Sequence, residues 1–169
     1  MSKGRWIFIG LAWMAAGSLA MAAMQITAPG FANGQPMPAK YARTGHNISP
    51  ILRVKGVPDK AKSLALIVED PDAPTPSFTH WILWNISPQH VVFLEGRPPR
   101  GAVVGKNGFG ALKYDGPQPP SGTHHYIFHL YALDTRIDLP AGSGHDALIS
   151  AMQGHILAEA QTVGTYQAK

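Results

Sequence analysis

Four side chains that could bind ligands or carry protons lie where proline-rich loops meet apolar runs. They are Asp70, Asp72, His80 and His124. A histidine paired with a carboxylate is held in one tautomer and becomes an imidazolium more easily. Two such histidines, together with backbone N–H groups from a rigid loop, suit a phosphate or a carboxylate. The carboxylates would orient the donors from behind the anion, and we favour this anion-binding hypothesis.

The same four side chains allow other interpretations. An Asp-x-Asp sequence with two histidines could ligate zinc or a similar ion, and an Asp before proline often caps a turn. The sequence shows no metal-ligand spacing on a defined element. It also contains no Gly-x-Ser-x-Gly, no phosphate-binding glycine loop and no His-Glu-x-x-His. We therefore predict no catalytic residue, no metal and no cofactor; the alternative is a hydrolase that acts on a phosphoester through the Asp/His cluster or a bound metal.

Apolar runs beside these loops predict the strands that position them. Leu64–Val68 and Trp81–Ile86 are short and rich in β-branched and aromatic residues, which favours two buried strands. A third strand, His124–Leu133, places Tyr126 on the same face as His124 and one step deeper. The other predicted elements are strands at Ile51–Val54, Val91–Leu94 and Gln161–Gln167, a short helix at Asp146–Met152 and a long surface loop at Arg97–Gly110.

These elements indicate a mostly β fold, an antiparallel sheet or sandwich with one or two short peripheral helices. The strands do not alternate with long helical patterns, so a doubly wound parallel sheet is not expected. A basic start, an apolar run and small residues predict a signal peptide over residues 1–23, cleaved after Ala22 or Ala23. A retained membrane anchor is the alternative. Residues 24–169 then form a single periplasmic or secreted domain, without stable membrane insertion after cleavage.

Charge and cysteine content exclude several classes of partner and site. Cleavage would remove Lys3 and Arg5 from 14 basic residues, which leaves 12 against 10 acidic residues and lowers the net charge from +4 to +2. The remaining basic residues are scattered, so no nucleic acid partner is predicted. The sequence has no cysteine, which excludes disulfides, thiolate metal sites and a cysteine nucleophile.

Several short motifs follow one another in a defined order. They are Asn47-Ile-Ser-Pro50, Asp70-Pro-Asp-Ala-Pro74, His80-Trp81 with Asn85, Gly116-Pro-Gln-Pro-Pro120, His124-His-Tyr126 and Val163-Gly-Thr-Tyr166. In this order they resemble the phosphatidylethanolamine-binding protein family, in its bacterial Raf-kinase-inhibitor-like branch. The resemblance covers nearly all of the chain after residue 23. It implies a β-rich fold around a large antiparallel sheet, with a small anion pocket at one end.

Together with the residues above, the resemblance defines a candidate ligand-binding set. The set is Asp70, Asp72, Pro74, His80, Gly116, Pro119, His124 and Tyr126. Together with the predicted signal peptide, the resemblance implies an exported, non-catalytic protein that binds phosphate, a phosphorylated small molecule or a lipid head group. The alternative is an inhibitor of an envelope protease or a kinase-like enzyme, with Arg97–Gly110 as its contact surface.

This chain departs from the branch at the pocket. Bacterial relatives often carry cysteine before the Asn-x-Ser-Pro motif and inside the Gly-Pro-x-Pro-Pro loop, where this chain has Arg43-Thr-Gly45 and Gln118. The arginine usual after the pocket histidine is His125 here, which removes a fixed positive charge near the mouth. We therefore expect anion binding to strengthen as the pH falls toward about 6, where histidine gains a proton.

Overall fold

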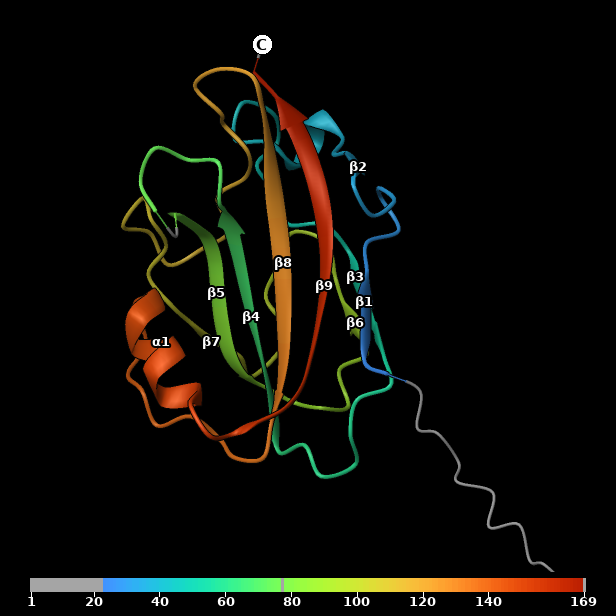
Figure 1. The fold of residues 1–169 in the computed structure, drawn as a ribbon, viewed down its shortest axis with the longest axis vertical. Coiled ribbons are helices and arrows are strands. Elements are labelled where there is room, and N and C mark those ends of the chain that lie inside the picture. Colours follow the sequence, from blue (N-terminus) through green and yellow to red (C-terminus); the bar gives the residue numbers. More distant parts are fainter. Residues whose placement is uncertain (1–22, 77, 169) are drawn as a thin grey trace, which may run out of the picture.

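Two β-sheets form the body of the molecule (Figure 1). The computed structural model describes residues 23–76 and 78–168, so the predicted signal peptide lies outside the described residues apart from Ala23. The strands are β1 (Gln25–Thr27), β2 (Gln35–Pro36), β3 (Leu52–Lys55), β4 (Ser63–Asp70), β5 (Phe78–Ile86), β6 (Val92–Phe93), β7 (Val103–Val104), β8 (Thr123–Leu133) and β9 (Ile156–Gln167), and the helices are the 3-10 turn η1 (Ala39–Tyr41) and α1 (His145–Met152).

The larger sheet has six strands in the order β2-β9-β8-β4-β5-β7, and the smaller has three in the order β1-β3-β6. All neighbours pair antiparallel except β2 and β9, which are parallel. The predicted mostly β, largely antiparallel fold with a short peripheral helix is therefore confirmed. In Figure 1, α1 lies beside β5 and β7, on the other side of the large sheet from β1, β3 and β6.

Both faces of the large sheet are covered at its centre. Alternate residues of β4 face the small sheet, and the residues between them face α1. Leu66 belongs to the hydrophobic cluster between the two sheets, and Ile67 belongs to the cluster between the large sheet and α1. Burial on both faces explains why β4 and β5 read as continuous apolar runs instead of alternating ones. The two runs could therefore be recognised as core strands directly from the sequence.

Two predicted boundaries were wrong. β9 begins at Ile156 instead of Gln161, since its first half also pairs with β8, while the side chains of that half stay exposed or half-buried. The segment Arg97–Gly110 is not loop throughout, since β7 inside it pairs with Leu83 and Trp84 of β5. A two-residue edge strand is too short to produce a periodic signal.

Irregular pairing in β5 sets the direction of its side chains. Trp81 pairs with Val68 and Thr79 pairs with Glu69, so β5 carries one residue more than β4 at this point and His80 is the extra residue of a bulge. A second irregularity lies near Asn85, whose φ is 56°. The Asn85 side chain accepts a hydrogen bond from the Ile137 amide at 2.8 Å and donates one to its carbonyl at 2.9 Å.

Candidate functional site

The polar residues predicted to act together lie at one end of the central strands of the large sheet. β4 ends at Asp70, while β5 and β8 begin near His80 and His124. Antiparallel pairing therefore brings these three strand ends to the same end of the sheet. A pocket of about 170 Å³ opens there. Its walls are formed by Asp70, Ala73, Pro74, Thr75, Phe78, His80, Phe109, Gln118, Pro120 and His124.

Asp70 and His124 form a buried pair in this pocket. The side chain of His124 donates from Nδ1 to Oδ2 of Asp70 at 2.7 Å, and the two residues are 7% and 4% exposed. The other carboxylate oxygen of Asp70 accepts a hydrogen bond from the backbone amide of Asp72 at 2.9 Å. Both oxygens of Asp70 are therefore engaged, which fixes the His124 ring and leaves its Nε2 for a ligand.

His80 is held in an equivalent way by a backbone carbonyl. Its Nδ1 lies 2.6 Å from the carbonyl oxygen of Asp115, and because a carbonyl only accepts, Nδ1 must carry a proton. The residue is 3% exposed, and burial lowers the pKa of His80 below its ordinary value of 6.5. The Asp115 carbonyl and the negative charge of Asp70 oppose that shift without cancelling it. His80 is therefore mainly neutral at pH 7, with a free electron pair on Nε2.

A buried carboxylate fixes the segment that holds His80. Asp115 is 1% exposed, and its oxygens accept hydrogen bonds from the side-chain amides of Asn47 and Asn107 at 2.9 and 3.0 Å. Burial raises the pKa of Asp115, but these hydrogen bonds and the charge of Lys113 outweigh it and leave the pKa below its ordinary value. The sequence reasoning missed Asp115; its position next to Gly116, at the start of the Gly-Pro loop, was the available signal.

The remaining predicted residues occupy different places. Pro74 lines the pocket together with Asp70, His80 and His124, whereas the other four predicted residues are not part of its wall. Those four are Asp72, Gly116, Pro119 and Tyr126. Asp72 is half-exposed and binds the His125 backbone amide at 2.8 Å and the His125 ring at 2.7 Å, so it ties the loop after β4 to β8.

Three of these residues are buried outside the pocket wall: Tyr126, Gly116 and Pro119. The Tyr126 ring packs edge-on against His80 with centroids 5.0 Å apart, and its buried hydroxyl has no hydrogen-bond partner within the described residues. Burial, and then the charge of Asp70, raises the pKa of Tyr126, so the hydroxyl stays protonated. Gly116 and Pro119 are both buried, and a Cβ at position 116 would clash with the Tyr41 carbonyl oxygen.

The mouth of the pocket is aromatic, which the sequence reasoning did not anticipate. Phe78 and Phe109 lie edge-on to one another at 4.9 Å, and both contact the His80 ring. The guanidinium of Arg43 lies 4.0 Å from the centre of the Phe109 ring. A permanent positive charge therefore stands beside the mouth, although the position after His124 is a histidine.

The described residues show neither a metal-ligand cluster nor a membrane-spanning helix. Within residues 23–76 and 78–168, no group of three or more histidine, cysteine, aspartate or glutamate residues is arranged to hold a metal ion. In the same residues, no helix has the length and apolar character needed to cross a membrane.

Comparisons with known proteins agree on one family and on the fold. The family model described as phosphatidylethanolamine-binding protein matches residues 27–167. A UPF0098 protein of Methanothermobacter thermautotrophicus is 49% identical over 136 residues, covering 78% of this chain and 90% of the relative. The crystal structure of the phosphatidylethanolamine-binding protein homologue CT736 from Chlamydia trachomatis has a TM-score of 0.82 and 44% identity, covering 87% of this chain and 99% of that one. The structure of E. coli YbcL, a member of the mammalian PEBP family, has a TM-score of 0.82 and 32% identity, covering 88% and 100%.

Proposed function

The chain belongs to the phosphatidylethanolamine-binding protein family, and from this premise we propose that it binds phosphate or a phosphorylated head group in the pocket of Asp70, His80 and His124. One observation carries the proposal. Two buried imidazoles line a single pocket, and each has Nδ1 bonded to a protein acceptor, so both keep Nε2 for a ligand.

This arrangement can bind a phosphate in two protonation states. A neutral imidazole with its proton on Nδ1 accepts a hydrogen bond at Nε2, which a protonated phosphate oxygen can donate. Once the ring gains a second proton, Nε2 donates to a phosphate oxygen and adds an opposite charge. The pocket therefore takes a phosphate monoanion at neutral pH and a dianion after one imidazole is protonated.

The rest of the ligand contacts the mouth. Phe78, Phe109 and Pro120 present apolar surface beyond the two histidines, and Arg43 adds positive charge beside it. A phosphate group at the polar end, joined to a small organic substituent between the aromatic rings, uses both parts of the pocket. Ligand pockets commonly combine an apolar lining with a few placed polar groups.

We further propose that the protein acts by binding alone and is exported. Both oxygens of Asp70 and the Nδ1 atoms of both histidines are already bonded within the protein, so their role in the apo protein is to orient the pocket. The apolar N-terminal stretch with its small-residue cleavage pattern supports export to the periplasm or medium.

Isotope-labelled protein titrated with phosphate and with phosphoethanolamine tests the binding site. We expect the backbone amide resonances of Asp70, His80 and His124 to shift and to saturate. The variant His124→Asn keeps a donor toward Asp70 but loses Nε2, and should weaken binding about tenfold or more. The matched control is His155→Asn, because His155 pairs with Asp134 at 2.8 Å at the opposite end of β8. Equal affinities for the two variants would contradict the proposal.

Inhibition of an envelope protease or kinase-like enzyme is the second candidate function. Phe109 belongs to the segment Arg97–Gly110, is exposed and forms part of the pocket mouth. A protein partner seated on this segment would therefore cover the pocket. Capture of a stoichiometric partner from an envelope extract, retained by His124→Asn and lost with Phe109→Ala, would favour inhibition over small-ligand binding.

A further inference from the structure

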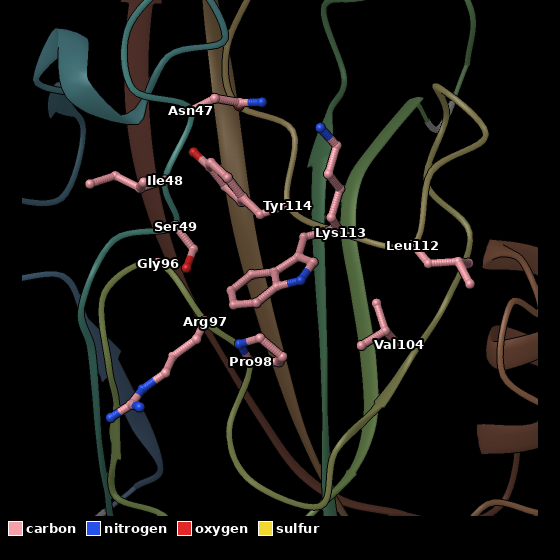
Figure 2. Close-up of a pocket in the computed structure, with 11 residues that line it drawn as sticks. Asn47, Ile48, Ser49, Gly96, Arg97, Pro98, Val104, Leu112, Lys113 and Tyr114 are labelled. Atoms are coloured by element: carbon pink, nitrogen blue, oxygen red, sulfur yellow. The ribbon is translucent and has the colours of Figure 1, made fainter.

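Figure 2 shows a second pocket, of about 200 Å³. It shares no wall residue with the first pocket. Residues adjacent in sequence line the two different pockets. His80 lines the first and Trp81 the second, while Lys113 and Tyr114 line the second immediately before Asp115, whose carbonyl holds His80. The second pocket is therefore built on the same rigid segments as the first.

Two aromatic rings form part of the wall of this pocket, and its lining as a whole is about as polar as it is apolar. Trp81 and Tyr114 meet edge-on with centroids 5.7 Å apart, and the side chains of Val104 and Leu112 complete the wall shown in Figure 2. The Tyr114 hydroxyl donates to the Tyr41 carbonyl at 3.0 Å, so it is already committed within the protein. The two rings suit a flat aromatic molecule.

One polar atom in the wall has no partner. Ser49 is 2% exposed, lines the pocket, and its Oγ makes no hydrogen bond to any described residue. Figure 2 shows this hydroxyl on the pocket wall beside Gly96. A buried hydroxyl without a partner is costly, and a ligand with a single hydrogen-bonding group would satisfy it.

The charged side chains around the pocket do not enter it. Arg97 and Lys113 are both exposed, and Figure 2 shows the guanidinium of Arg97 directed away from Tyr114. Lys113 is also 3.4 Å from the Asp115 carboxylate. The buried part of an occupant is therefore uncharged.

From the volume, the two aromatic rings in the wall and the unpartnered hydroxyl, we propose that this pocket is a second ligand site, for a small neutral aromatic molecule bearing one hydroxyl group. An apolar cavity of about 150 Å³ is known to bind benzene, so a volume of about 200 Å³ accommodates one substituted six-membered ring. The hydroxyl of the ligand would exchange a hydrogen bond with Ser49, and its ring would pack on Trp81 and Tyr114.

Titration of isotope-labelled protein with phenol, and with toluene as the matched ring without a hydroxyl, tests the site. We expect phenol to shift the Trp81 indole N–H and the Gly96 amide saturably. The variant Ser49→Ala removes the hydroxyl without adding volume, and should weaken phenol binding about fivefold while changing toluene binding less than about twofold.

A blocking variant tests the location independently. Val104→Phe fills the pocket and should weaken both probes at least tenfold, whereas Leu157→Phe, at an exposed position of β9 outside the pocket, should change neither. The proposal is overturned if phenol shifts no resonance of the pocket up to its solubility limit. It is also overturned if Ser49→Ala, checked as folded by its thermal transition, weakens phenol and toluene equally.

Discussion

Sulfate and phosphate should respond differently to pH in the pocket of Asp70, His80 and His124. Sulfate remains a dianion that cannot donate a hydrogen bond, whereas a phosphate monoester has a second pKa of about 6 and so retains a donor in part of the range. Both imidazoles carry the Nδ1 proton in the neutral form, and Nε2 of neutral His80 repels a sulfate oxygen. Sulfate binding therefore requires an additional proton on an imidazole, while phosphate can supply its own.

The size of the effect follows from proton linkage. If one proton is taken up with each sulfate, the affinity rises tenfold per pH unit, or about 1.36 kcal/mol, as the pH falls toward the pKa of the free imidazole. Burial lowers the pKa of His80 from 6.5, so the contribution of His80 continues to grow below pH 6.5. From pH 7.5 to 5.5 we therefore expect sulfate affinity to rise by about tenfold to a hundredfold and phosphate affinity by less.

Isothermal titration calorimetry in two buffers of different ionisation enthalpy measures both the affinity and the proton uptake. His80→Asn is the informative variant, because an asparagine side-chain amide can still donate to the Asp115 carbonyl but cannot gain a charge. In this variant about one proton fewer should be taken up with each sulfate, so the slope of log affinity against pH should fall by about one. A pH-independent sulfate affinity in the wild-type protein, or an unchanged slope in His80→Asn, would refute the reasoning.

The same lowered pKa affects the stability of the ligand-free protein. Unfolding returns His80 to water and to its ordinary pKa of 6.5, so the unfolded chain binds more protons than the folded one below that pH. The contribution of neutral His80 to the free energy of unfolding is complete above pH 6.5. It is lost as the pH falls below 6.5, by at most about 1.36 kcal/mol per pH unit. Urea unfolding at pH 7.5 and 5.5 should show this loss in the wild type and a smaller one in His80→Asn.

Three further substitutions separate the parts of the site. Asp70→Asn removes the charged acceptor of His124 and should cost about 1.5–3 kcal/mol of unfolding free energy in urea at pH 7; a loss below about 0.5 kcal/mol would contradict a buried hydrogen bond to a charged carboxylate. Gly116→Ala forces a Cβ against the Tyr41 carbonyl and should cost about 2 kcal/mol or more by thermal unfolding, against less than about 1 kcal/mol for Gly144→Ala, where the added atom meets nothing within 4 Å. Arg43→Gln should weaken phosphate binding about threefold in low salt, with the difference shrinking at high ionic strength; equal loss at all salt concentrations would exclude a charge effect.

The sequence was sufficient to predict the parts of the fold that local patterning controls. β4, β5 and β8 are dense in apolar and β-branched residues, and α1 has the spacing of a short amphipathic helix ended by Gly154. The joint position of Asp70, His80 and His124 also followed from a local argument, since all three stand at junctions of a loop and a core strand. Each of these predictions depended on neighbours within a few residues along the chain.

Contacts between distant segments were beyond the same reasoning. The acceptor that fixes His80 is a backbone carbonyl 35 residues away, and a backbone carbonyl has no sequence signature. Arg43 reaches the mouth only because the loop after η1 packs against the segment that carries Phe109. Asp72 looked like a pocket residue from its spacing, yet it binds His125 on the outer side of β8.

The bulge in β5 explains why both pockets exist. In a regular strand consecutive side chains point to opposite faces, so His80 and Trp81 could not both lie on the side of the large sheet that faces the small one. Thr79 and Trp81 pair with adjacent residues of β4, and the extra residue between them allows His80 to contact Tyr126 while Trp81 joins the core beneath the second pocket. In a β5 without this bulge, strict alternation would turn either His80 or Trp81 toward α1 and abolish one pocket. The register of β4 with β5 is therefore the structural feature on which both sites depend.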